Sequence, residues 1–180
     1  MTAPSDPDRR RRFEDLVDGV YGPLQRYLLR RTDVTTAEDV LGDVLLVLWR
    51  RSDDIPAEAP LAWCYAVARR CLANSLRGAQ RRTRLLARLT ELPAAAIEHT
   101  DPDLNEALDA LSEADRELLR LWAWEQLPPR EIAQVLDISP NAASIRLHRA
   151  TGRLRSHLTA RKDPTARGQL QGQHGTEASR

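Results

Sequence analysis

The segment from Pro129 to Ala150 restricts the possible folds of this chain more than any other, because it has the pattern of two short helices joined by a tight turn. Apolar residues give the first helix one buried face. They are Ile132, Ala133, Val135 and Leu136. Asp137 follows where a left-handed backbone is needed, which aspartate tolerates better than most residues. Ile138 then packs the turn into the core, while Ser139 and Pro140 suit the cap and first position of the next helix. The segment is predicted to be a helix-turn-helix.

The second helix of this motif is predicted to have a buried face and a polar, basic face. The buried positions are Ala143, Leu147, Ala150, Leu154 and Leu158. The exposed ones are Asn141, Ser144, His148, Thr151 and Arg155, flanked by Arg146, Arg149 and Arg153. A helix that enters the major groove of DNA needs such a face on its N-terminal half. Arg130, on the preceding helix, is well placed for a phosphate. A plain helical hairpin is the alternative, and pattern with charge favours DNA binding over it.

The charges are clustered although the net charge is only +1. Seven arginines and no acid lie between residues 69 and 88, and five arginines, one lysine and no acid lie between 140 and 162. Either stripe alone is better interpreted as a solvated helix face. Both together favour two surfaces that contact phosphates.

The first basic stripe lies on a long helix predicted from about residue 61 toward residue 89. Its members recur at helical spacing, headed by an indole. They are Trp63, Arg70, Arg77, Arg81, Arg84 and Arg88. Arginines bind the backbone of a nucleic acid, and an exposed aromatic ring can stack on an unpaired base. The stripe therefore suits single-stranded or melting DNA. For Trp63 alone, a buried core position is the favoured alternative.

An acidic and strongly apolar helix precedes that stripe. It is predicted to begin at Thr35, which forms a capping-box pattern with Glu38, and to continue through the apolar run 40–49. Asp39 and Asp43 share it. The apolar residues exceed what one buried stripe requires, so part of them could form an interface. A fully buried central helix is equally compatible with the pattern.

Periodicity predicts an all-α protein of two small helical domains joined by a flexible linker. The predicted parts are a disordered N-terminus (1–11), a first domain (12–89), a linker (90–103), a helix-turn-helix domain (104–160) and a disordered tail (161–180). Gly22 and Pro23 predict a kink or a fresh helix start, and 52–60 is predicted to be a loop. The short helices of the second domain are expected at about 104–110, 113–125, 129–136 and 140–159.

Several functions are disfavoured by what the sequence lacks. Cys64 and Cys71 are interpreted as small core residues, and no Cys/His cluster has zinc-ligand spacing, so no metal or cofactor is expected. No acid/base constellation, phosphate-binding loop or nucleophile motif indicates an enzyme. Neither a signal peptide nor a membrane span is evident, so we expect a cytoplasmic protein without membrane insertion.

Three segments in order resemble the extracytoplasmic-function group of sigma-70 family RNA polymerase sigma factors. Residues 37–49 resemble the acidic, apolar helix of region 2 that binds the polymerase clamp. Residues 62–70 resemble the region 2 helix that helps to melt the −10 element. Residues 131–150 resemble the region 4 helix-turn-helix that binds the −35 element. The chain departs from the family pattern at Gly42, Arg70, Asp137 and Ala143, without losing any whole surface.

The resemblance implies a bacterial alternative sigma factor that binds core RNA polymerase and promoter DNA. For core polymerase it implies Asp39, Asp43, Leu46 and Trp49. For −10 DNA it implies Trp63, Arg69, Arg70, Arg77 and Arg81, with the 52–60 loop capturing a flipped base. For −35 DNA it implies Ser144, His148 and Arg149 on the bases and Arg130, Asn141 and Arg146 on phosphates. It also implies an anti-sigma factor as a partner.

A conventional helix-turn-helix repressor or activator is the competing hypothesis. Its N-terminal half would dimerise or bind a ligand, and it would need no polymerase. That hypothesis leaves the arginine stripe headed by Trp63 and the acidic helix unexplained. Tight binding to duplex DNA without polymerase would favour it.

Overall fold

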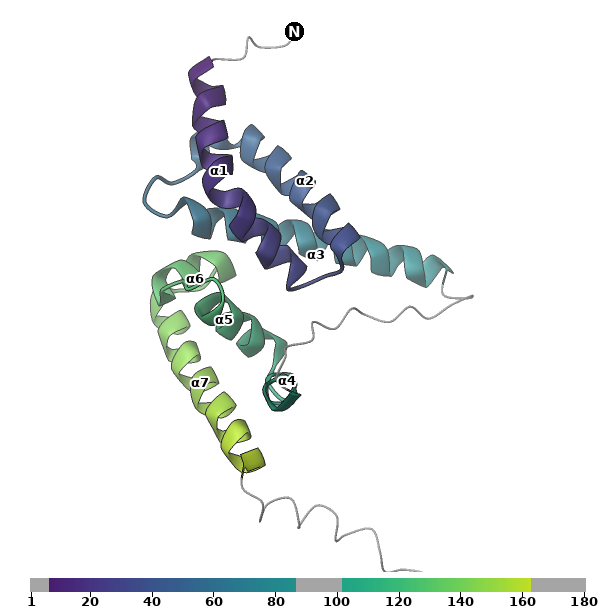
Figure 1. Cartoon of the computed structure of the whole chain (residues 1–180), viewed down its shortest axis with the longest axis vertical. Helices are drawn as coiled ribbons and strands as arrows, with labels where there is room; N and C mark the ends of the chain where they lie inside the picture. The colour runs from purple at the N-terminus through teal and green to yellow at the C-terminus, as the bar shows by residue number, and fades with distance from the viewer. Residues whose placement is uncertain (1–6, 87–101, 163–180) are drawn as a thin grey trace, which may run out of the picture.

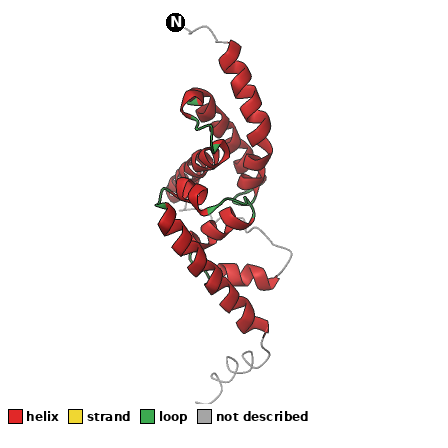
Figure 2. Cartoon of the chain, turned by 90° about the vertical axis from the view of Figure 1, so that its left-hand side faces the viewer, coloured by secondary structure: helices red, strands yellow, loops and turns green. Residues whose placement is uncertain are grey.

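The computed structural model describes residues 7–86 and 102–162, in which all regular secondary structure is helical (Figures 1 and 2). The N-terminal unit contains α1 (Pro7–Leu29), α2 (Val34–Arg50), the short 3₁₀ helix η1 (Ser52–Asp54) and α3 (Pro60–Leu86). The C-terminal unit contains α4 (Pro102–Asp109), α5 (Glu113–Ala123), α6 (Pro129–Leu136) and α7 (Pro140–Lys162). The all-α prediction is confirmed for the described part of the chain.

The cap of α2 is not the one predicted. The helix begins at Val34, and Asp33 is its N-cap residue. The Asp33 carboxylate accepts hydrogen bonds from the backbone N–H of Thr36 at 2.9 Å and from the Thr36 hydroxyl at 2.7 Å. These bonds lower the pKa of Asp33. A capping box beginning at Thr35 is therefore wrong, because a charged carboxylate two residues earlier satisfies the helix N-terminus and interacts favourably with its dipole.

Helix α1 begins at Pro7, although residues 1–11 were predicted to be disordered. Contacts with α2 and η1 explain the earlier start. Arg9 donates one hydrogen bond to the Trp49 carbonyl oxygen at 2.8 Å and another to the Ser52 hydroxyl at 2.9 Å. The helix also continues through Pro23 without ending there. The structure describes only the last two residues of the predicted linker (90–103), which begin α4. It describes only the first two residues of the predicted tail (161–180), which end α7.

A buried apolar cluster joins the two units. From the N-terminal unit it includes Leu24, Leu28, Val44, Leu48, Tyr65 and Leu72; from the C-terminal unit it includes Leu118, Leu121, Ile132 and Val135. Helix α6 packs against both α3 and α7. A smaller cluster lies within the C-terminal unit, where Leu108, Leu111 and Leu119 surround Ala150. Because the larger cluster has residues from both units, the units share part of their hydrophobic core.

A network of buried ion pairs also joins the turn that follows α1 to the C-terminal unit. The Arg31 guanidinium lies 3.1 Å from Glu117 Oε2 and 3.2 Å from Glu125 Oε1. Arg30 lies 2.6 Å from Glu125 Oε2, and the Tyr65 hydroxyl donates to the same oxygen at 3.3 Å. The side chain of Glu125 is only 2% exposed. These charges are withdrawn from water, so each depends on its partners.

Among the described residues, no helix combines the length and the apolar composition needed to cross a membrane.

Candidate nucleic-acid interface

The turn between α6 and α7 has the predicted helix-turn-helix geometry. Asp137 ends α6 with φ 57° and ψ 50°, the left-handed conformation. The N–H of Ile138 donates to the Ala133 carbonyl oxygen at 3.0 Å, and the Ile138 side chain packs against the shared core. The Ser139 hydroxyl accepts from the N–H of Ala142 at 3.2 Å, and α7 begins at Pro140. The predicted roles of these turn residues are confirmed.

Replacing Asp137 with glycine is expected to raise the free energy of unfolding by about 0.5–1 kcal/mol. Glycine adopts the left-handed conformation without the steric cost of a Cβ atom, and this relief exceeds its added chain entropy. Chemical denaturation with urea measures the change. Asp137→Ala is the control and should be less stable than the wild type, because alanine keeps the Cβ and loses the polar side chain. A stabilising Asp137→Ala would contradict the explanation.

Helix α7 has the two faces that its sequence predicts. Ala143 and Ala150 are completely buried, and Leu147 and Leu154 are half-buried. All six side chains predicted to contact −35 DNA are exposed: Arg130, Asn141, Ser144, Arg146, His148 and Arg149. The Ser144 hydroxyl donates to the Pro140 carbonyl oxygen at 3.0 Å, which leaves its oxygen free to accept. The structure therefore places these six residues at the surface of the helix-turn-helix.

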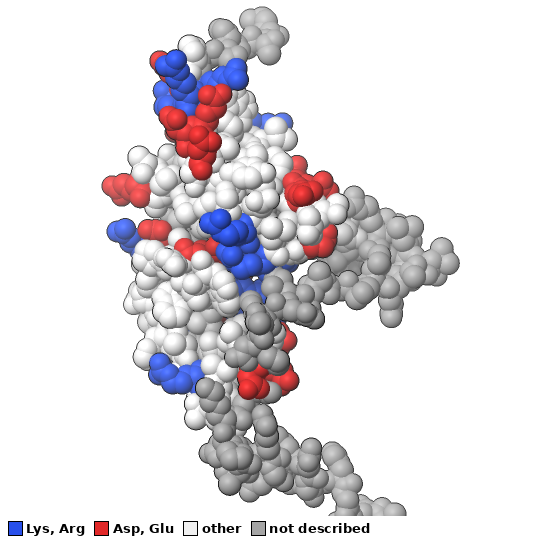
Figure 3. Space-filling model, in the orientation of Figure 1, with Lys and Arg blue, Asp and Glu red and all other residues white. Residues whose placement is uncertain are grey.

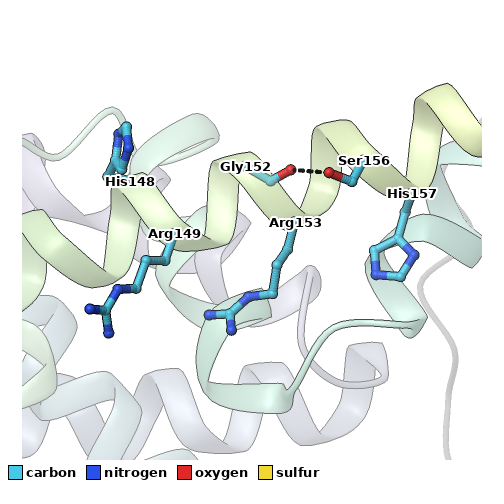
Figure 4. A pocket seen from close by; sticks show the side chains of 6 residues that line it. All are labelled: His148, Arg149, Gly152, Arg153, Ser156 and His157. Carbon is cyan, nitrogen blue, oxygen red and sulfur yellow. Dashed lines mark hydrogen bonds between the residues drawn. The ribbon is translucent and has the colours of Figure 1, made fainter.

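Basic side chains line a shallow hollow along α7 (Figure 4). Arg149 and Arg153 point to one side of the helix and His148 points to the other. Arg153 lies 2.9 Å from the carboxylate of Asp115, so it links α7 to α5. Arg149 is exposed and has the freedom to reach a ligand. Of these two arginines, Arg149 is thus the better candidate for contact with DNA.

The basic stripe of α3 is also exposed where its side chains are described. Arg69, Arg70, Arg77 and Arg81 are exposed. The side chain of Arg84 and all of Arg88 lie outside the described residues. Trp63 is half-buried: one part packs against the shared core, and the Arg51 guanidinium lies 5.3 Å from its ring. Trp63 is therefore neither a fully buried core residue nor a fully exposed one.

Helix α2 has an exposed face, so it is not the fully buried central helix that its composition also allowed. Val40, Val44 and Leu48 are buried. Asp39 and Asp43 are exposed, and so is Leu46, at 54%. Trp49 is half-buried, its ring packed edge-on against Phe13 at 5.0 Å and beneath the Arg9 guanidinium. Of the four residues predicted to bind polymerase, three thus lie on an open face and Trp49 faces α1.

The view in Figure 3 shows charged side chains in separate groups on an otherwise uncharged surface. Acidic and basic groups alternate near the N-terminal end of α1, where Arg10 pairs with Glu14 at 2.8 Å. On the face shown, the charged side chains thus gather in separate patches.

The two cysteines are core residues. Cys64 is completely buried, and this burial raises the pKa of its thiol to about 12. Burial also raises the pKa of the half-buried Cys71, with a contribution from the nearby charge of Asp43. Neither thiol is activated as a nucleophile, because activation requires a lowered pKa. In residues 7–86 and 102–162, no group of His, Cys, Asp and Glu has the arrangement of a metal site.

Sequence reasoning missed two features. One is the ion-pair network among Arg30, Arg31, Glu117 and Glu125, whose partners lie 86 to 95 residues apart. The other is Ile145, which is 44% exposed on α7 although it is a large aliphatic residue. The helical spacing of Ile145 from Ala143 was a signal that could have identified it.

Comparisons with known proteins agree with this arrangement. Residues 103–154 match the family model described as Sigma-70, region 4. No curated protein matches the chain. The solved structure of CnrH in complex with the cytosolic domain of CnrY has a TM-score of 0.55 and 25% identity, covering 84% of this chain and 90% of that one.

Two further solved structures share the fold at lower identity. The sigma factor RpoE from Bartonella quintana, in complex with the anti-sigma factor NepR, has a TM-score of 0.64 and 20% identity, covering 82% of this chain and 96% of that one. The PhyRSL–NepR complex from Sphingomonas sp. Fr1 has a TM-score of 0.62 and 13% identity, covering 92% of this chain and 96% of that one.

Proposed function

We propose a division of labour among three surfaces of this chain, which is an extracytoplasmic-function sigma factor of the sigma-70 family and directs transcription initiation. One observation supports the division above all. The matched region 4 contains a helix-turn-helix whose second helix exposes a polar, basic face while its opposite side is buried. The chain is not an enzyme, and it acts by binding other macromolecules.

The first surface is the exposed face of α7, which we assign to the −35 element. Ser144, His148 and Arg149 lie on the N-terminal half of the helix, where side chains reach base edges in the major groove. Arg130, Asn141 and Arg146 flank them at positions suited to phosphates. The exposure of these side chains supports the assignment.

The second surface is the exposed side of α3, which we assign to the −10 element. Arg69, Arg70, Arg77 and Arg81 provide positive charge along about three turns of helix, which suits the backbone of a separated strand. Trp63 lies at the N-terminal end of this stripe, next to the segment between η1 and α3. We propose that this segment, within residues 52–60, captures a flipped base and that Trp63 supports the opened DNA.

The third surface is the open face of α2, which we assign to bacterial core RNA polymerase. Asp39, Asp43 and Leu46 recur at helical spacing on this face. The exposure of Leu46 beside two carboxylates supports a contact that combines an apolar centre with charge. Trp49 contributes chiefly by holding α2 against α1. A partner of this kind would place the chain in the cytoplasm.

We further propose that an anti-sigma factor regulates this chain. The solved structure of the sigma factor RpoE from Bartonella quintana contains the anti-sigma factor NepR as its partner. That structure and this chain share their fold over most of both chains. The likeness supports an anti-sigma partner without identifying it.

Run-off transcription with core polymerase tests the proposal. Fragmented DNA from the source genome serves as template, with and without the chain. We expect new start sites that require the chain, with shared upstream sequences at −10 and −35. Arg149→Ala should weaken binding to the −35 element about tenfold or more while binding to core polymerase stays unchanged. Asp43→Ala, the control, should weaken polymerase binding and leave recognition of the −35 sequence intact.

Two results would contradict this division of labour. If Arg149→Ala lowered DNA binding and polymerase binding together, α7 would not be a separate −35 surface. If active core polymerase made no new starts, and the chain bound specific duplexes tightly by itself, a conventional helix-turn-helix regulator would be the better explanation.

A further inference from the structure

Ile145 lies at the centre of the outward face of α7. An α-helix turns about 100° per residue. Ile145 therefore stands about 200° from Ala143 and about 140° from Ala150, the two residues that α7 buries completely. Its side chain is 44% exposed. The core of the chain thus does not account for an aliphatic residue at this position.

The residues around Ile145 indicate what its apolar side chain would contact. A single exposed apolar residue is ordinary on a protein surface. Here, however, the adjacent positions one helical turn away are Asn141, His148 and Arg149, all exposed and all assigned to promoter DNA. Ile145 is therefore surrounded by side chains that form hydrogen bonds, on the surface that would face the major groove.

The major groove presents one apolar group on its base edges, the C5 methyl group of thymine. The other groups are hydrogen-bond donors and acceptors, which an isoleucine cannot satisfy. Its branched side chain has few rotamers, so little conformational entropy is lost when the contact forms. We propose that Ile145 is a specificity-determining residue that contacts the C5 methyl of a thymine in the −35 element, an inference that rests on the proposed function of α7.

The expected loss of DNA affinity can be calculated from the single methyl group that Ile145 would bury. Replacing a thymine with deoxyuridine removes one methyl group and keeps the base pairing. Burial of one such group corresponds to about fourfold in affinity. The loss should occur at one position of the −35 element, the base pair that Ile145 contacts. The hydrogen bonds made by Arg149 and His148 should remain.

The experiment uses the full chain with core polymerase on a promoter duplex whose start site has been mapped. Each thymine of the −35 element is replaced in turn with deoxyuridine, and dissociation constants are measured for the wild type, Ile145→Ala and Ile145→Val. We expect one substitution to weaken wild-type binding about fourfold. Ile145→Ala should bind the thymine duplex more weakly and should not distinguish thymine from uracil. Ile145→Val should retain part of the discrimination.

Three outcomes would overturn the inference: a −35 element without thymine, no penalty for uracil at any position, or an equal penalty in the wild type and Ile145→Ala. Arg149→Ala separates this failure from failure of the proposed function. If Arg149→Ala still loses −35 binding, α7 remains the reader and only the role of Ile145 is wrong. If neither variant changes DNA binding, both are wrong. Because Ile145 is exposed, an unchanged melting temperature should confirm that its variants are folded.

Discussion

Replacing Arg31 with alanine is expected to lower the free energy of unfolding by about 3–5 kcal/mol, because it leaves the carboxylate of Glu117 without its guanidinium partner and that of Glu125 with Arg30 alone. The Arg31 side chain is 5% exposed and contacts Glu117 and Glu125 on α5 and just beyond it. It also donates to the Tyr27 carbonyl oxygen at 2.9 Å, and its guanidinium carbon lies 3.6 Å from the centre of the Tyr27 ring. The Arg31 side chain thus contacts two carboxylates, one backbone carbonyl group and one aromatic ring.

The charge state of Arg31 agrees with this role. Burial is the largest single effect and disfavours the charged form, but Glu117, Tyr27 and Glu125 together outweigh it and raise the pKa of Arg31. Burial, together with Glu117, also raises the pKa of Tyr27, so its hydroxyl stays protonated and can donate to Glu117. The cluster therefore holds a permanent cation against two carboxylates, and removing that cation leaves the negative charge of Glu117 unpaired.

Urea denaturation measures this loss, with two variants as controls. Arg10→Ala removes the same residue type from an exposed pair with Glu14 and should change stability little, because solvent screens that pair. Arg31→Lys keeps the charge but cannot span both carboxylates, so its stability should lie between those of the wild type and Arg31→Ala. If Arg31→Ala were no more destabilising than Arg10→Ala, the network would not hold the units together.

Replacing Ile132 with alanine is expected to lower the free energy of unfolding by about 2–5 kcal/mol and to destabilise both units. Ile132 is completely buried on α6, which packs against α7 on one side and α3 on the other. It belongs to the cluster that includes Tyr65 and Leu72 of the N-terminal unit. A cavity at this position should therefore weaken α3 as well as the helix-turn-helix.

Amide hydrogen exchange shows how far the effect of Ile132→Ala extends. If the two units unfold together, the slowest amides of α3 and of α7 should exchange faster by a similar factor. Ile132→Val removes a single methylene and should cost only about 0.5–1.5 kcal/mol, which calibrates the measurement. Faster exchange in α6 and α7, with α3 unchanged, would show that the units unfold independently despite their shared core.

The helix-turn-helix could be predicted from the sequence because its determinants are local. The buried positions of α7 recur every three or four residues. The left-handed turn at Asp137 and the cap at Ser139 depend on residues within a few positions of each other. Such signals require no knowledge of the rest of the fold. Exposure of the five predicted −35 residues that lie on α7 follows directly from this periodicity.

The cap of α2 shows where local signals become ambiguous. Asp33 and Thr35 are both good N-cap residues, and Glu38 strengthens the case for Thr35. The structure uses Asp33, whose carboxylate accepts two hydrogen bonds from Thr36. The same limit applies to Trp63 and Trp49, whose partial burial depends on Arg51 in one case and on Phe13 and Arg9 in the other.

The sequence by itself determined the all-α class and the polar face of α7, since both depend on residues close together in the chain. Only the tertiary structure decided that the units share a core and that Arg31 pairs with Glu117 and Glu125. Periodicity indicates which face of a helix is buried but not which helix covers it, because that depends on how all the faces pack together at once.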